Sequence, residues 1–164
     1  MDATTSLRVP MEKFVDKLRK DYAYLSFKET GIASWSPHAS QVTYASSGDE
    51  TNVWSTLHEL GHALMGHTSY ASDIELIKKE AEAWDKAVLV AKSYGISIDQ
   101  GHIQDCLDTY RDWLHKRSSC PACGSHGLQR SKGLYCCLNC QNTWKVSSAR
   151  FCRPYRLKNA HSAN

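Results

Sequence analysis

The sequence predicts an α+β fold in two parts, residues 1–117 and residues 118–164. Three observations lead to this prediction. Apolar residues recur at helical spacing in four segments before Arg117, stretches typical of short strands follow the first segment, and two closely spaced cysteine pairs come after the last. We therefore expect helices with a small antiparallel sheet, and then a small basic module with too few apolar residues to fold without a metal ion.

The first part is expected to begin with a helix and two strands. Residues 10–24 place Phe14, Val15 and Leu18 on one side of a helix. Residues 23–29 and 33–45 have the composition of short strands, and the turn signal at residues 29–31 separates them. The second strand could receive an extended peptide along a sheet edge, or it could be an ordinary strand of the sheet.

Three further helices are expected before the boundary at Arg117. The first runs from a cap at Ser47, paired with Glu50 three residues later, to about Gly66. The next starts at Ser72, again with an acidic residue three positions later, and ends at Gly95. The last covers residues 103–117. Residues 118–148 show no helical period and are rich in Gly, Ser and Cys.

Composition and charge limit the class of protein. Hydrophobic residues make up 41% of the chain and charged residues 23%, as in a soluble globular protein. No apolar run approaches the ~20 residues of a membrane span, and the N-terminus lacks a secretory signal. A cytoplasmic protein is expected. Residues 1–112 hold 11 Lys and Arg against 17 Asp and Glu (net charge −6), whereas residues 113–164 hold 9 basic residues and no acidic one (+9). This asymmetry indicates an anionic partner, with nucleic acid the leading candidate, for the second part.

His58, Glu59 and His62 form an HExxH motif on the second helix. Residues four apart share a helix face, so both imidazoles can reach one ion, and imidazole suits zinc. Glu59 is rotated by roughly 100° from His58, which places it beside a water on the metal rather than among the ligands. The apolar and small residues around the motif indicate a partly buried helix, where two unpaired imidazoles would be costly. We therefore predict a catalytic zinc site with Glu59 as general base.

Such a site needs a third protein ligand. His67, five residues after His62 and across a glycine, could fold back to the metal, but this spacing is not that of the families with a third histidine after a glycine turn. On the next helix an apolar stripe serves as a reference, and Glu80 lies about 60° from its centre, against about 140° for Glu82 and about 160° for Glu75. Glu80 is therefore the predicted third ligand. His67 or Tyr70, on the connection between the two helices, could instead donate to the oxyanion of the reaction, or be solvated loop residues.

These segments resemble the ImmA/IrrE-type metallopeptidases of bacteria and phages. The resemblance covers roughly residues 10–95 and is carried by HELGHALMGH and EAEAWDKA. It implies a zincin-like domain of the gluzincin type, a glutamate ligand at Glu80, and cleavage of proteins such as repressors or DNA-associated proteins. Trp84 stands where the family usually has Asn or Asp. We therefore expect the polar group that steadies a histidine ligand to be missing, unless Asp85 replaces it.

The second part contains a C-x-x-C…C-x-x-C pattern. In a reducing compartment this spacing predicts a closed, structural zinc site of four thiolates. Cys136 is adjacent to one of them, but the spacing to Cys140 favours Cys137, so Cys136 should point away. Cys106 and Cys152 are interpreted as spare or buried thiols. The predicted ligands are Cys120, Cys123, Cys137 and Cys140.

This module resembles a zinc ribbon, through Tyr135, Trp144 and the second cysteine pair. Zinc ribbons bind nucleic acid, bind proteins or brace a fold. Tyr135, Trp144 and Tyr155 could stack on bases among phosphate-binding residues, or the basic residues could form a solvated tail. The predicted nucleic-acid-binding residues are Arg130, Lys132, Lys145, Arg150, Arg153 and Arg156.

The leading hypothesis is a zinc endopeptidase with two zinc ions per chain, a protein substrate and no contact with membranes. One alternative is a SprT-like protease that acts on DNA-bound proteins. That family also joins HExxH to a zinc ribbon, but its third ligand is a histidine, and the next well-spaced one here is His102. A second alternative is a DNA-binding regulator that keeps the metal and cuts nothing, although a binding-only site has no need of Glu59.

Overall fold

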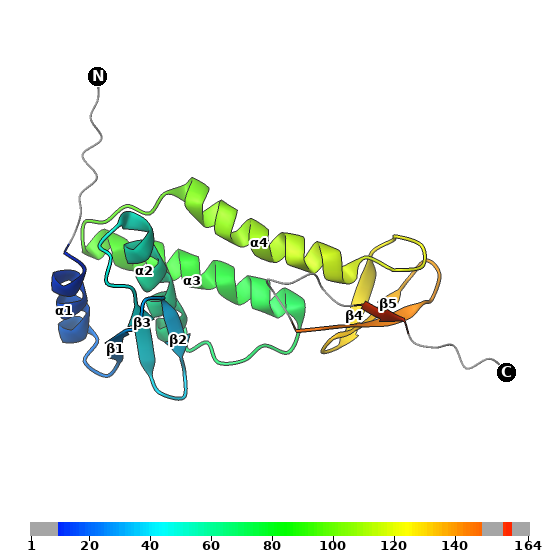
Figure 1. The fold of residues 1–164 in the computed structure, drawn as a ribbon, viewed down its shortest axis with the longest axis horizontal. Helices are drawn as coiled ribbons and strands as arrows, with labels where there is room; N and C mark the ends of the chain where they lie inside the picture. Colours follow the sequence, from blue (N-terminus) through cyan, green and yellow to red (C-terminus); the bar gives the residue numbers. More distant parts are fainter. Residues whose placement is uncertain (1–9, 149–155, 159–164) are drawn as a thin grey trace, which may run out of the picture. The chain divides into compact units, whose positions relative to one another are not determined.

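The computed structural model describes residues 10–148 and 156–158 (Figure 1). The described residues form four α-helices and two small sheets, which confirms the expected α+β class. They divide into two compact units. The first contains the described residues up to Thr68 together with Lys79–Asp99, and the second contains Ser69–Lys78 and the described residues from Gln100 onwards. The second unit thus includes one whole helix that precedes the boundary expected at Arg117.

The described part of the first unit combines two whole helices and the greater part of a third with a three-stranded sheet. α1 (Met11–Asp21) is amphipathic, as predicted, and buries Phe14, Val15 and Leu18. The sheet contains β1 (Ser26–Glu29), β2 (Ser34–Ser36) and β3 (Gln41–Tyr44), in the order β1-β3-β2. α2 (Glu50–Leu64) and the greater part of α3 (Asp73–Ser93) complete the unit.

The sheet differs from the sequence prediction in two respects. Residues 33–45 are not one strand but a hairpin, because a turn at residues 37–40 reverses the chain; the Ser40 N–H donates to the Pro37 carbonyl, and Ser40 has a φ of 47°. The sheet is also mixed rather than antiparallel. β2 pairs antiparallel with β3, but β3 lies between β2 and β1 and runs parallel to β1. β2 is therefore an edge strand.

The caps of α2 and α3 follow from local hydrogen bonds. Asp49, not the predicted Ser47, caps α2, because its carboxylate accepts the Asn52 N–H at 2.9 Å. The Ser47 hydroxyl instead donates to the Asp49 carboxylate at 2.6 Å. The predicted cap of α3 is confirmed, since the Glu75 N–H donates to the Ser72 hydroxyl at 3.2 Å. α2 ends at Leu64, close to the predicted end.

The second unit contains α4 (Gln100–Ser118) and a sheet of four antiparallel strands. These are, in spatial as in chain order, β4 (Gly127–Ser131), β5 (Leu134–Cys137), β6 (Thr143–Val146) and β7 (Arg156–Lys158). The small core of this sheet is Cys120, Tyr135, Cys137 and Trp144. Because so few apolar residues are buried, other links have to hold the sheet together.

A buried polar network provides one such link. The Asp73 carboxylate accepts a hydrogen bond from Arg117 at 2.8 Å and another from the Tyr135 hydroxyl at 2.5 Å. Asp73 and Arg117 are 2% and 3% exposed, so each charge depends on the other for compensation. The Trp144 indole N–H donates to the Arg117 carbonyl. The first turn of α3, the end of α4 and strands β5 and β6 are thereby joined.

Among residues 10–148 and 156–158, none of the helices combines the length and the hydropathy that a membrane crossing requires.

Candidate metal centres

His58, His62 and Glu80 converge in the first unit, as predicted. The His58 Nε2 lies 3.1 Å from the His62 Nε2 and 3.1 Å from the Glu80 Oε2, and the His62 Nε2 lies 3.5 Å from the same oxygen. Donors that surround a tetrahedral ion at ~2.0–2.1 Å would be roughly 3.3–3.4 Å apart. The three donor atoms therefore have the spacing of a group that could hold a metal ion.

The close packing of α2 and α3 produces this spacing. His58 and His62 lie one turn apart on α2, on either side of Gly61. A Cβ at Gly61 would come within 2.3 Å of the Ala83 carbonyl oxygen on α3. Only the lack of a side chain at position 61 lets the two backbones come this close. Since Glu80 is one turn before Ala83 on α3, its carboxylate reaches the two imidazoles.

Burial and charge act in opposite directions on the two carboxylates. Burial raises the pKa of Glu80, but the hydrogen bonds from His58 and His62 outweigh it and hold that pKa well below its usual range. Burial also raises the pKa of Glu59, and there the effects of His58 and His62 are smaller than the cost of desolvation. Glu59 accepts a hydrogen bond from the Trp35 backbone of the edge strand β2. The two histidines thus favour the anionic form of Glu80, and they act on the pKa of Glu59 from close by.

Away from Glu80 and His62, the ring of His58 is supported by an aromatic side chain rather than by a further hydrogen bond. Its imidazole stacks on the Trp84 indole, with 4.3 Å between ring centroids and 27° between planes. Its Nδ1 is buried and has no hydrogen-bond partner. Trp84 was expected to remove the polar group that steadies a histidine, and this geometry agrees. Asp85 is exposed and does not replace it.

His67 lies behind His62 rather than beside the group of three donors. Gly66, with a φ of 66°, reverses the chain after α2, and the His67 Nδ1 comes within 2.9 Å of the His62 Nδ1. The His67 Nε2 lies 3.4 Å from the Glu82 carboxylate. Both ring nitrogens thus face protein groups, so His67 does not fit the role of oxyanion donor considered from the sequence. The other candidate for that role, Tyr70, belongs to the second unit, where the Lys132 ammonium is 5.0 Å from its ring centroid.

The four predicted cysteines also converge, in the second unit. The Cys120 Sγ lies 3.6 Å from the Cys140 Sγ, and the Cys123 Sγ lies 3.5 Å from the Cys137 Sγ. Sulfurs around a tetrahedral zinc at ~2.3 Å would be roughly 3.8 Å apart. Ser125 and Asn139 hydrogen-bond the Cys123 thiol and lower its pKa to about 6, which favours the thiolate that binds metals.

Each cysteine pair lies in a tight turn that directs backbone N–H groups at sulfur. The Ala122 N–H donates to the Cys120 Sγ at 3.4 Å, and the Cys140 N–H donates to the Cys137 Sγ at 3.5 Å. Cys136 lies outside the group, as predicted, and its Sγ contacts the Cys137 carbonyl. Cys106, half-buried on α4, has its Sγ 3.6 Å from the His102 Nε2. Cys152 lies outside the described residues.

The predicted nucleic-acid-binding residues are described only in part. Arg130, Lys132 and Lys145 are exposed on or beside β4 and β6. Arg150, Arg153 and the side chain of Arg156 lie outside the described residues, as does Tyr155. The prediction that Tyr135 and Trp144 stack on bases is wrong. They are 2% and 0% exposed and stack on each other, because the small sheet needs both rings for its core.

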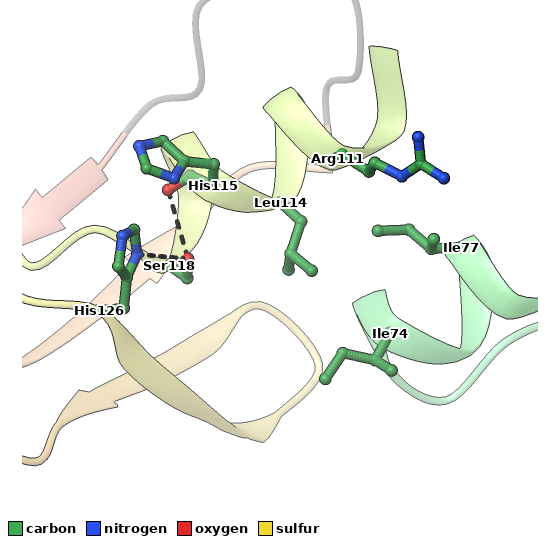
Figure 2. A pocket seen from close by; sticks show the side chains of 7 residues that line it. All are labelled: Ile74, Ile77, Arg111, Leu114, His115, Ser118 and His126. Carbon is green, nitrogen blue, oxygen red and sulfur yellow. Dashed lines mark hydrogen bonds between the residues drawn. The ribbon is translucent and has the colours of Figure 1, made fainter. Parts of the chain in front are cut away.

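The second unit also has an apolar hollow of about 410 Å³ (Figure 2). Its apolar side chains are Ile74, Ile77 and Leu114. Arg111, His115, Ser118 and His126 complete it; the Ser118 hydroxyl donates to the His115 carbonyl and lies 3.2 Å from the His126 Nδ1 (Figure 2). None of these residues belongs to either group of side chains that could hold a metal ion.

Comparison of the chain with protein-family models, with curated proteins and with solved structures found no significant match. What the protein does must therefore be inferred from these two groups of side chains.

Proposed function

We propose that the protein is a zinc-dependent endopeptidase of the ImmA/IrrE type, with a catalytic zinc on His58, His62 and Glu80 and a structural zinc on the four cysteines. The observation that carries the proposal is the triangle of donor atoms with Glu59 next to it. Two imidazoles and one carboxylate leave a tetrahedral ion one free position, whereas four thiolates leave none. The first group therefore suits catalysis and the second suits structure.

A zinc ion at the first group would supply Lewis acidity, polarising the scissile carbonyl and acidifying water. The protein's own residues do the rest. Glu59 takes a proton from the attacking water and returns it to the leaving nitrogen. β2 is an edge strand of the described sheet, and its Trp35 backbone hydrogen-bonds Glu59, so an extended peptide that pairs along this edge would lie near the general base.

The SprT-like alternative is less well supported. It requires a histidine as third ligand, and the group of donor atoms contains Glu80 instead. His102 lies on α4, in the second unit, where its Nε2 contacts Cys106.

Glu59→Gln tests the peptidase. The variant should still bind two zinc ions per chain, measured by elemental analysis, because Glu59 is not one of the donors. Its cleavage of a proteome-derived peptide library, measured by mass spectrometry of new termini, should fall by about 10²–10⁴-fold. Glu50→Gln, at the exposed start of the same helix, is the matched control and should cleave like the natural chain. Equal cleavage by the Glu59→Gln and natural chains, or no cleavage by the zinc-loaded natural chain, would contradict the proposal.

We also propose that the cysteine module docks the enzyme on nucleic acid through its exposed basic residues. Fluorescence anisotropy with a short DNA duplex, repeated at increasing salt, measures this. Each phosphate contact contributes about 0.9 to the slope of log affinity against log salt, so Lys132→Ala and Lys145→Ala should each reduce that slope by about 1. A chain that does not bind the duplex at low salt would indicate a protein partner for the module instead.

A further inference from the structure

We propose that His67 and Glu82 are positioning residues that hold His62 in the one tautomer able to bind the metal. The inference rests on the proposed metal site but not on peptidase activity. Neither residue was predicted to have this role, and neither belongs to the three donors.

The side chains of His62, His67 and Glu82 contact one another in series. The His62 Nε2 faces the other donors, while its Nδ1 lies 2.9 Å from the His67 Nδ1. The other ring nitrogen of His67 lies 3.4 Å from the Glu82 Oε2. His67 is only 8% exposed, so its ring is held within the protein and not in solvent.

A metal ion on His62 would determine which ring nitrogen carries the proton in both His62 and His67. To bind an ion, the His62 Nε2 must present a lone pair, so the proton of the neutral ring is on Nδ1. That N–H can donate only to a bare nitrogen, which requires the His67 Nδ1 to be the acceptor. The remaining proton of His67 is then on Nε2, where it faces the Glu82 carboxylate. The result is a relay in which Glu82 orients His67 and His67 orients His62, as carboxylates commonly orient metal-binding histidines.

The backbone holds His67 in this place independently of its ring. Its N–H donates to the His62 carbonyl at 3.0 Å, and its carbonyl accepts the Trp35 indole N–H at 2.8 Å. A substitution of the imidazole can therefore leave the turn intact. His58 offers the contrast, because its Nδ1 has no such partner and its ring rests on Trp84.

The test is zinc affinity in the full chain, measured by competition with a chromogenic chelator after the four-cysteine site has been filled. His67→Leu removes the acceptor and should weaken the second equivalent of zinc by about 10–100-fold. His67→Asn places an amide oxygen near the lost Nδ1 and should restore most of the affinity. His38→Leu changes an exposed histidine in the turn between β2 and β3 and is the matched control, with no expected change.

A spectroscopic readout separates positioning from a merely structural role. In the zinc-loaded natural chain, ¹⁵N shifts should show the His62 proton on Nδ1 and the His67 proton on Nε2. Unchanged affinity in His67→Leu, a His67 proton on Nδ1, or failure of His67→Asn to bind better than His67→Leu overturns the proposal. Uptake of a single zinc by the natural chain overturns it together with the metal site. If the zinc affinities change as expected but the natural chain cleaves no peptide, the positioning roles of His67 and Glu82 are supported and the proposed peptidase activity is contradicted.

Discussion

Gly61→Ala tests how the separation of α2 and α3 sets the metal site. The Cβ added at position 61 would lie 2.3 Å from the Ala83 carbonyl oxygen, and also 3.1 Å from the Ala83 carbonyl carbon. Both are backbone atoms, so no side chain can rotate away to make room. To restore ordinary contact at 3.4 Å, the two helices must separate by about 1 Å.

This separation has a cost in stability and a larger one in metal binding. Overpacking of a core by one methyl group lowers the free energy of unfolding by about 1–3 kcal/mol. The distances from the two histidines to Glu80, now 3.1 and 3.5 Å, would become roughly 1 Å longer than the ~3.3–3.4 Å that a tetrahedral ion allows. The distance between the histidines is set within α2 and would not change. In the variant, the two imidazoles should still reach one ion, but the Glu80 carboxylate should be too far away to bind it.

Elemental analysis after dialysis against a weak chelator, with urea unfolding alongside, measures both effects. We expect one zinc per chain instead of two, and an unfolding midpoint at a lower urea concentration than in the natural chain. Gly101→Ala, the same substitution at an exposed position near the start of α4, should leave both zinc ions in place and change stability by no more than about 0.5–1 kcal/mol, in the stabilising direction. A Gly61→Ala chain with two tightly held zinc ions would show that helix spacing does not set the site.

Two further predictions concern the second unit. Cys137→Ser should lose the structural zinc and unfold the sheet of β4 to β7, whereas Cys136→Ser should keep the metal; elemental analysis and circular dichroism distinguish the two, and equal metal loss would refute the assignment of Cys137. Arg117→Leu leaves the buried Asp73 without a compensating charge and should lower the free energy of unfolding by about 3–5 kcal/mol in urea. The double variant with Asp73→Leu should be more stable than Arg117→Leu alone, and a single variant as stable as the natural chain would contradict this.

The sequence was most informative where the structure depends on local periodicity. The position of Glu80 relative to the apolar stripe of its helix predicted that its carboxylate would face the histidines, and it lies 3.1 and 3.5 Å from them. The two-residue spacing between Cys137 and Cys140 likewise selected the correct member of an adjacent cysteine pair. Both predictions needed only the geometry of one helix or one turn.

Predictions failed where neighbouring groups compete or where distant segments meet. Ser47 and Asp49 are both suitable caps, and the stronger acceptor, a carboxylate, took the position at the helix end. β1 pairs in parallel with β3, which is not the next strand along the chain. The residues of neither strand indicate such a pairing. The role of Tyr135 and Trp144 in the core was missed, because an aromatic residue in a basic segment is equally compatible with a core position and with stacking on bases.

The contact of His67 with His62 depended on a reversal that the sequence indicates only weakly. Gly66 was expected to end the helix, and a return of His67 was considered only as a route to the metal, not as a contact with the far side of the His62 ring. The sequence features that could have indicated this contact are a glycine followed by a histidine just after the HExxH helix, and an acidic residue two positions after Glu80.

The two donor groups differ in chemical softness, and this gives an experimenter separate control over them. Four thiolates prefer soft ions, whereas two imidazoles with a carboxylate accept harder ones. Cadmium or copper(I) added in limiting amount should therefore enter the cysteine cluster first, and cobalt(II) offered afterwards should occupy the histidine group. A chain filled in this order would carry a different reporter at each centre, so that events at one could be followed without interference from the other.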